Sequence, residues 1–309
     1  MEIDLPERFS VEWMLNHIRT SSYGIPYRFA DLHVLRRALW LDGTPVVAEF
    51  DLSQTGTMKV RLVSRQALGR RPGRSGVDLL ESLAAQARFL WGLDGNAEEP
   101  YEAIASDPHM APLLARFGPL RVVRAADLYE ALLVTVIGQQ VSVPSAQAVR
   151  RRLIRNMGTG IEAGAAPGMD TYYLYPTPRQ ILTADESALR AQGVSRQKSA
   201  YLREIAECAA AGDLDLAVFA TLSDEDAIAR LCRIRGVGRW TAEIALMRGL
   251  GRSDIFAAGD LGLQAAVQEL WGMPQRPSEK TLRGIAGNWR GWRSYAAFYL
   301  WMTLQCRAL

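Results

Sequence analysis

The segment LCRIRGVGRWTAEIALMRGLGRSDIFAAGDLGLQAAV, residues 231–267, combines a glycine pair with one isolated carboxylate. Gly236 and Gly238 separate two apolar runs of helical spacing, so they predict two helices joined by a tight turn. Backbone N–H groups at the start of the second helix would then be available to bind an anion such as a phosphate. A glycine pair also occurs in ordinary helix turns, so the pair alone does not establish this function.

The isolated carboxylate is Asp260, in the small and apolar stretch AAGDLGLQAAV. This pattern predicts a helix that begins just after Asp260, with the aspartate as its N-cap. Capping aspartates are common, so capping by itself does not indicate catalysis. The two roles are compatible, because the N-terminus of a helix favours a negative charge.

The elements that must position these residues fall into two groups. Near the N-terminus, PVVAEFDL and TMKVRLVS predict a β-hairpin, and DLHVLRRALWLDG before them supplies a further strand. From about residue 77 the pattern is helical, beginning with DLLESLAAQARFLWGL, for which Asp78 is the predicted N-cap. Residues 127–143 are apolar nearly all round and predict a buried helix, whereas 158–175 are rich in glycine and predict an inserted loop. The expected fold class is α+β, with a small N-terminal antiparallel sheet domain followed by a mainly α-helical body.

Composition narrows the function classes. The chain has 309 residues, a formal net charge of +3 and a pI of about 8.8, which permits a nucleic-acid partner without requiring one. Its three cysteines form no CxxC pair and its three histidines are isolated, which argues against zinc, iron–sulfur and histidine metal sites. The N-terminus has no apolar signal core and no run reaches the roughly 18 apolar residues of a membrane span. The three sparse cysteines fit a reducing cytosol, so we expect a cytoplasmic protein, associated with the nucleoid if the source is bacterial.

Several motifs carry a resemblance to a known family. LCRIRGVGRWTA resembles the helix–hairpin–helix of the base-excision DNA glycosylase superfamily, and Asp260 matches its catalytic aspartate. LYEALLVTVIGQQVSVPSA, NWRGWRSYAAFYLW and the N-terminal FSVEWMLNHI resemble the AlkA family, the DNA-3-methyladenine glycosylase II type. The resemblance implies an N-terminal α+β domain over 1–115, a central helical domain over 116–230, and the hairpin, catalytic aspartate and C-terminal helices over 231–309. The segment 158–175 is longer than the family pattern.

The resemblance also implies roles for individual residues. Asp260 would be catalytic, and Gln140 would be the side chain inserted into the duplex, where several relatives have leucine. The hairpin would bind DNA phosphates mainly through backbone N–H groups, with the residues Gly236, Val237, Gly238, Arg239 and Thr241. A monovalent cation, Na⁺ or K⁺, would be held by the backbone carbonyls of Cys232, Ile234 and Val237. The base pocket would be lined by Trp240, Trp292, Ile244 and Trp13, and Ile244 replaces a tyrosine of the best-studied relatives. Trp289 and Trp301 are expected in the core.

The implied activity is the removal of alkylated purines such as 3-methyladenine from double-stranded DNA. Relatives that also cut the strand use a lysine just after GVG, and here that region reads Arg239-Trp240-Thr241. Because arginine stays protonated, we expect a monofunctional glycosylase that leaves an abasic site, acts as a monomer and has no iron–sulfur cluster. Two alternatives stay open: a glycosylase for hypoxanthine, ethenoadenine or uracil, and a non-catalytic DNA-binding protein.

Overall fold

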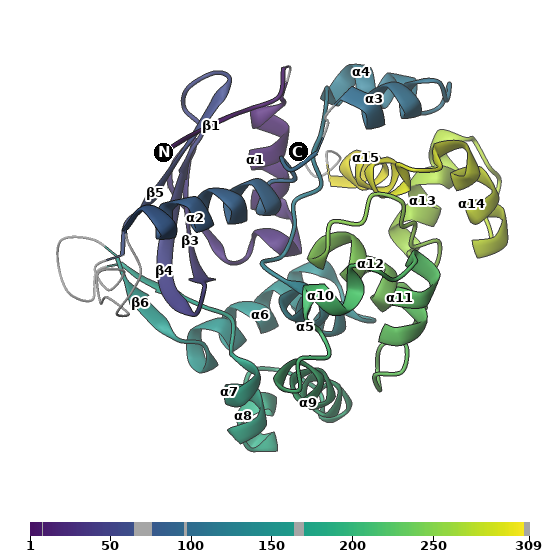
Figure 1. Cartoon of the computed structure of the whole chain (residues 1–309). Coiled ribbons are helices and arrows are strands. Elements are labelled where there is room, and N and C mark those ends of the chain that lie inside the picture. Colours follow the sequence, from purple (N-terminus) through teal and green to yellow (C-terminus); the bar gives the residue numbers. More distant parts are fainter. Residues whose placement is uncertain (8, 65–75, 96–97, 164–169, 306–309) are drawn as a thin grey trace.

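The computed structural model describes the chain except for residues 8, 65–75, 96–97, 164–169 and 306–309. A five-stranded antiparallel sheet near the N-terminus is followed by a body of helices (Figure 1). This arrangement confirms the expected α+β fold class. In the order β1-β5-β4-β3-β2, the strands are Glu2–Asp4 (β1), Thr57–Leu62 (β5), Thr44–Asp51 (β4), Val34–Leu41 (β3) and Tyr27–Asp31 (β2).

The hairpin predicted from sequence is β4–β5, in which Phe50 lies opposite Val60, and the strand predicted before it is β3. Both predictions are confirmed. The two outer strands were not predicted. β1 has only three residues, and β2 is a five-residue edge strand, YRFAD, so neither is long enough to show the alternation that marks a half-buried strand.

The two faces of the sheet pack against different elements. Val46, Ala48 and Phe50 of β4 face the main hydrophobic core, which also contains residues of α2 (Gly76–Leu90). Val47 points to the opposite face, where it packs in a second cluster with residues of the short strands β6 (Gly160–Glu162) and β7 (Thr171–Tyr173). The prediction of a loop over 158–175 is therefore wrong in part, because three-residue strands are too short to show a sequence period.

The remaining helical elements form the body. They are α1 (Val11–Thr20), η1 (Ser22–Gly24), α3 (Glu98–Ala105), α4 (Ala111–Phe117), α5 (Leu128–Gly138), α6 (Val143–Met157), α7 (Pro178–Thr183), α8 (Glu186–Ala191), α9 (Arg196–Ala210), α10 (Leu216–Phe219), α11 (Asp224–Leu231), α12 (Arg239–Gly249), α13 (Leu261–Leu270), α14 (Glu279–Ile285), η3 (Ala286–Trp289) and α15 (Arg293–Gln305). Among the described residues, no helix is both long and apolar enough to cross a bilayer.

Helix α5 is the buried helix predicted over 127–143, and nine of its eleven residues are buried. It is shorter than predicted, because it ends at Gly138 and α6 begins at Val143 with Ser142 as its N-cap. Asp78 was predicted as the N-cap of α2. It lies instead inside the first turn, where its charge still complements the helix dipole.

A buried ion pair joins the sheet to α5. The Nη2 of Arg37 on β3 donates to both carboxylate oxygens of Glu130, at 2.7 and 2.6 Å. Arg37 is 1% exposed and Glu130 is 7% exposed, so both charges depend on each other for compensation. This pair holds the N-terminal sheet to the helix that leads into the candidate site.

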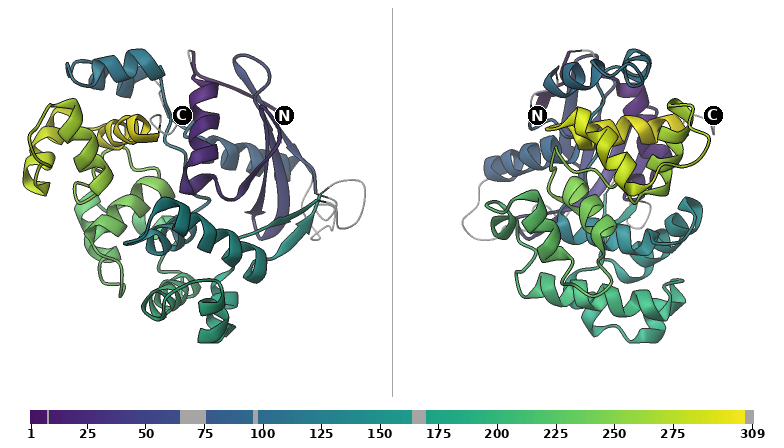
Figure 2. Two further views of the ribbon diagram at one scale, coloured as in Figure 1. Left: turned by 180° about the vertical axis from the view of Figure 1, so that it is seen from behind. Right: turned by 90° about the vertical axis from the view of Figure 1, so that its right-hand side faces the viewer.

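Helix α1 lies between the sheet and α15 (Figure 2), and His17 is its buried contact with α15. The Nδ1 of His17 lies 2.9 Å from Oε1 of Gln305, and its ring packs edge-on against Phe298. Burial, helped by the nearby Arg248 charge, lowers the pKa of His17 to about 3. The imidazole is therefore neutral in the folded protein at physiological pH.

We expect acid to destabilise the protein through His17. The ordinary pKa of 6.5 applies in the unfolded chain, which therefore binds a proton at pH 5 that the folded chain does not. The stability that neutral His17 contributes is complete above about pH 6.5 and is lost as the pH falls toward 3. Protonation of His17 in the unfolded chain should therefore lower the free energy of unfolding by about 2 kcal/mol between pH 7 and 5. Urea unfolding at both pH values should show that His17→Gln loses about 2 kcal/mol less than wild type. Equal losses would contradict this assignment.

Candidate active site

The centre of the site is the Asp260 carboxylate, which three N–H groups orient. Asp260 is the N-cap of α13, as predicted, and its Oδ1 accepts from the backbone N–H of Leu263 at 2.9 Å. The indole Nε1 of Trp240 donates to Oδ2 and that of Trp301 donates to Oδ1, both at 3.0 Å. Asp260 and the two tryptophans are each partly exposed, so the carboxylate and its aromatic neighbours are accessible from outside.

The helix–hairpin–helix segment, formed by α11, a tight turn and α12, supplies Trp240. The turn between them contains Gly236 at φ +88°, and the N–H of Val237 donates to the carbonyl of Ile234. A Cβ on Gly236 would lie only 2.1 Å from the ring of Tyr201, so both the backbone angle and the packing require glycine. The predicted tight turn between two helices is confirmed.

The start of α12 has the features of an anion site. Its N-cap is Gly238, which has no side chain to accept from the first N–H groups, whereas α11 and α13 are capped by the side chains of Ser223 and Asp260. The first backbone N–H groups of a helix have no intrahelical acceptor. Nothing lies within 4 Å of the position of a Cβ on Gly238, so a phosphate can approach this turn closely.

Two residues of this turn have side chains engaged within the protein. The guanidinium of Arg239 pairs with Glu225 at 2.6 Å and with Glu243 at 3.0 Å. The hydroxyl of Thr241 is buried and accepts from Nε2 of Gln139. At Thr241, the group available to a phosphate is therefore the backbone N–H and not the hydroxyl. The charge of Arg239 is already compensated by Glu225 and Glu243.

The predicted wedge, Gln140, lies on an exposed tip between α5 and α6. Gln140 has φ +52°, which is uncommon for a residue with a side chain, and it is exposed together with Val141. Gln139 holds this tip to the turn between α11 and α12, because its Nε2 also donates to the carbonyl of Gly236 at 2.9 Å. Sequence reasoning missed Gln139. The only available signal was the doubled glutamine in GQQVSV.

The structure groups the predicted pocket residues differently from the sequence. Trp240 contacts Asp260, and Ile244 follows one helical turn later on α12 and is 6% exposed. Trp292 packs edge-on against Tyr295 before the start of α15, nine residues from Trp301 and hence roughly 13 Å away along the helix axis. The second tryptophan that contacts Asp260, beside Trp240, is Trp301.

Trp301 was predicted as core, and this is only partly right, because Trp301 packs against the main core but its indole N–H donates to Asp260. The helix that carries it is apolar on all sides, so its spacing could not separate a core residue from a site residue. The usable signal was the indole N–H, which needs an acceptor when the ring packs against protein. Trp289 is the buried tryptophan of this region, as predicted, and its N–H donates to Asp107. Trp13 lies on α1 against Phe117 and Arg116.

The carbonyls predicted for a monovalent cation lie at the end of α11, for Cys232, and in the turn that follows, for Ile234 and Val237. Cys232 is the C-cap of this helix, where carbonyl groups lack intrahelical partners. The Ile234 carbonyl accepts one hydrogen bond, from Val237, which leaves its second lone pair available. Carbonyl oxygens at the negative end of a helix suit a small hard cation, so the donor chemistry fits.

Similarity to known proteins agrees with this geometry. A model of the HhH-GPD superfamily of base excision DNA repair proteins matches residues 133–290. The DNA-3-methyladenine glycosylase of Bacillus subtilis is 32% identical over 224 residues, which cover 72% of this chain and 73% of that protein.

Two solved structures extend the comparison. The 3-methyladenine DNA-glycosylase of Archaeoglobus fulgidus superposes with a TM-score of 0.80 at 26% identity, over 98% of this chain and 97% of that one. The 3-methyladenine DNA glycosylase of Schizosaccharomyces pombe, in complex with abasic DNA, gives a TM-score of 0.58 at 29% identity, over 66% of this chain and 96% of that one. With the hairpin and the capping aspartate in place, the chain belongs to the HhH-GPD superfamily of base excision DNA repair proteins.

Proposed function

We propose that this protein is a monofunctional DNA glycosylase, acting as a monomer, that removes alkylated purines such as 3-methyladenine from double-stranded DNA. The observation that carries the proposal is the Asp260 carboxylate held by the indole N–H groups of Trp240 and Trp301. The names of the relatives, which are 3-methyladenine glycosylases, support the class of lesion. The product would be an abasic site.

The chemistry of an alkylated base suits a site with two tryptophans and one carboxylate. A base must leave the duplex to be reached, which costs a few kcal/mol. A cationic base beside an indole face gains roughly 0.5–2 kcal/mol, so the tryptophans would favour alkylated over normal purines. Such a base already carries positive charge, and it leaves with the electron pair of the glycosidic bond without prior protonation.

Asp260 would act on the sugar. As the glycosidic bond breaks, positive charge develops at the C1′ and ring oxygen of the deoxyribose, and an adjacent carboxylate stabilises it. Water then adds to C1′ and gives its proton to the carboxylate or to solvent. The three N–H donors fix the carboxylate before the substrate arrives, which limits reorganisation during the reaction.

The α11–α12 turn and the Gln140 tip would hold the DNA. We place one strand phosphate on the backbone N–H groups at the start of α12, and a Na⁺ or K⁺ ion bound to the carbonyls of Cys232, Ile234 and Val237 would add positive charge there. Gln140 would enter the gap left by the flipped base. The hydrogen bond from Gln139 to Gly236 supports a joint role of the Gln140 tip and the α11–α12 turn in DNA binding, because it fixes the tip relative to the turn.

The lysines support a monofunctional enzyme. The chain has three, and none lies in the helix–hairpin–helix segment or directly after its GVG turn. Lys59 lies on β5 near Glu2, Lys198 donates to the carbonyls of Ile137 and Gln139, and Lys280 is exposed in the first turn of α14. We expect no covalent complex when the enzyme is treated with borohydride during turnover of alkylated duplex DNA. A trapped Schiff base would contradict monofunctional chemistry.

Ile244 motivates a second candidate, a glycosylase with a different range of lesions. An aliphatic side chain one turn from Trp240 offers neither a hydroxyl nor a ring face to the base. Excision assays on duplexes with 3-methyladenine, hypoxanthine, ethenoadenine or uracil separate the candidates. Lesion binding without excision of any base would instead favour a non-catalytic DNA-binding protein.

A pair of tryptophan variants tests the assignment of the pocket. Trp301→Phe keeps a ring but removes the N–H donor to Asp260, and a hydrogen bond to a charged group is worth about 1.5–3 kcal/mol. We therefore expect excision to slow by about 10- to 100-fold. Trp292→Phe is the matched control, because it also keeps a ring and Trp292 makes no hydrogen bond to Asp260, so it should change the single-turnover rate by less than about threefold. A larger effect at Trp292 than at Trp301 would restore the sequence prediction.

A further inference from the structure

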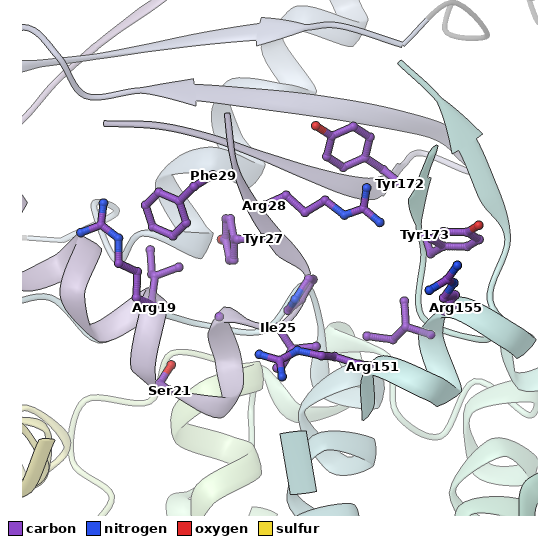
Figure 3. A pocket seen from close by; sticks show the side chains of 14 residues that line it. Arg19, Ser21, Ile25, Tyr27, Arg28, Phe29, Arg151, Arg155, Tyr172 and Tyr173 are labelled. Carbon is purple, nitrogen blue, oxygen red and sulfur yellow. The ribbon is translucent and has the colours of Figure 1, made fainter. Parts of the chain in front are cut away.

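A cavity of about 420 Å³ lies away from Asp260, between the N-terminal sheet, α6 and β7 (Figure 3). None of the residues predicted for the active site lines it. Its volume falls in the range of pockets that bind small molecules, roughly 300–1,000 Å³. The inserted segment contributes one wall through Tyr172 and Tyr173, so the insertion that departs from the family pattern helps to form this cavity.

Four arginines line this cavity, which we call the arginine cleft. Arg19 comes from α1, Arg28 from β2, and Arg151 and Arg155 from consecutive turns of α6. In Figure 3, Arg28 extends from the sheet toward Tyr172, while Arg151 and Arg155 extend from the helix below it. No aspartate or glutamate is among the described residues that line the cleft.

The charges of these arginines are uncompensated within the described part of the chain. Arg19 donates to the backbone carbonyl of Leu32, and no ion pair within 4 Å involves Arg28, Arg151 or Arg155 among the described residues. By contrast, Arg36 on the neighbouring strand pairs with Glu49 at 2.9 Å. Like charges that converge on one cavity repel each other, and a bound anion removes this repulsion. Arginine forks also match the geometry of phosphate oxygens.

Aromatic rings accompany the arginines. The guanidinium of Arg19 lies over the ring of Phe29 at 4.3 Å, and that of Arg28 lies over Tyr172 at 5.1 Å. Tyr173 is partly exposed and, like Arg155, lines the cleft (Figure 3). Planar bases stack on aromatic rings and on guanidinium groups, so the cleft combines donors for a phosphate with surfaces for a base.

We propose that the arginine cleft is a second binding site that takes a nucleotide, with its phosphate on Arg28, Arg151 and Arg155 and its base against Tyr173. The nucleotide can come from two sources with the same chemistry, a free nucleoside monophosphate or a unit of a DNA strand that extends beyond the lesion. The site is separate from Asp260. Its occupancy does not depend on the glycosylase reaction.

The test is calorimetric titration of the full chain with deoxyadenosine 5′-monophosphate, beside deoxyadenosine and inorganic phosphate. The test variant is Arg151→Gln/Arg155→Gln. The matched control is Arg179→Gln/Arg190→Gln, which removes the same charge from exposed positions outside the cleft. The arginines replaced in the two variants are all exposed, so both variants should fold, and their melting temperatures check this. Affinity for a short and a long lesion duplex is measured in parallel.

If the source is a free nucleotide, the monophosphate binds wild type and the control, binds the test variant at least about tenfold more weakly, and binds better than deoxyadenosine. If the source is a DNA strand, the test variant loses affinity for the long duplex but keeps its affinity for the short one. The proposal is overturned if neither ligand distinguishes the test variant from the control. Excision from the short duplex should be the same in all three proteins, so failure of the cleft is distinguishable from failure of the glycosylase.

Discussion

Replacing Asp260 with asparagine should slow single-turnover base release by about 10³-fold or more. The change removes the negative charge that would face the developing oxocarbenium ion, and loss of one preorganised electrostatic group typically costs 10²- to 10³-fold. Loss of the general base for water adds a further factor within the usual range of about 10²- to 10⁴-fold. The measurement is release of free base from alkylated duplex DNA with enzyme in excess.

Asparagine is a suitable substitute because its amide oxygen can still accept from Leu263 and Trp301, and only the hydrogen bond from Trp240 is lost. Asp260 caps α13 through Leu263, and asparagine is an equally good N-cap. The melting temperature and the affinity for lesion DNA should therefore stay close to wild type, which separates a catalytic loss from a folding defect. A variant that folds, binds and still releases base at the wild-type rate would remove Asp260 from the reaction.

The second large effect is on stability and concerns the ion pair between Arg37 and Glu130. Glu130→Ala leaves the guanidinium of Arg37 buried without its partner, and breaking a buried pair in this way costs about 3–5 kcal/mol. We expect a loss of this size in the free energy of unfolding from urea titration at neutral pH. Because the pair joins β3 to α5, we also expect the unfolding transition to become less cooperative between the sheet and the helical body.

A double variant identifies the cause. Arg37→Met/Glu130→Leu replaces both charges by apolar groups, and such replacements are often neutral or stabilising. It should therefore recover most of the stability lost in Glu130→Ala. If the double variant is as unstable as the single one, the loss comes from packing around α5 and not from an unpaired charge.

The helices and strands that could be predicted from the sequence are those long enough for their apolar residues to show a regular spacing. The β4–β5 hairpin and the all-round apolar helix α5 follow directly from the spacing of their apolar residues. Edge strands and the β6–β7 pair escaped prediction, because three to five residues show no period and their pairing is set by tertiary contacts. The contact between His17 and Gln305 joins opposite ends of the chain, and no local pattern indicates it.

The site was predictable where one residue type performs a local task. Asp260 is identifiable as an N-cap, and Gly236 is identifiable as the turn residue, because each depends on the backbone close to it. Trp301 is different, since it lies 41 residues after Asp260 in the chain and contacts it from another helix. Only the three-dimensional packing distinguishes Trp301 from Trp292 as a residue of the site. Residues brought together from distant helices are the part that spacing alone cannot supply.

The most direct test of the proposed function is chromatography of the free bases released from methylated duplex DNA by the wild-type protein, with the strands analysed in parallel. We expect free 3-methyladenine to appear and the strands to stay intact until alkali cleaves the abasic sites. No release of any methylated base by the folded protein would contradict the proposed function. Strand cleavage without alkali would contradict its monofunctional chemistry.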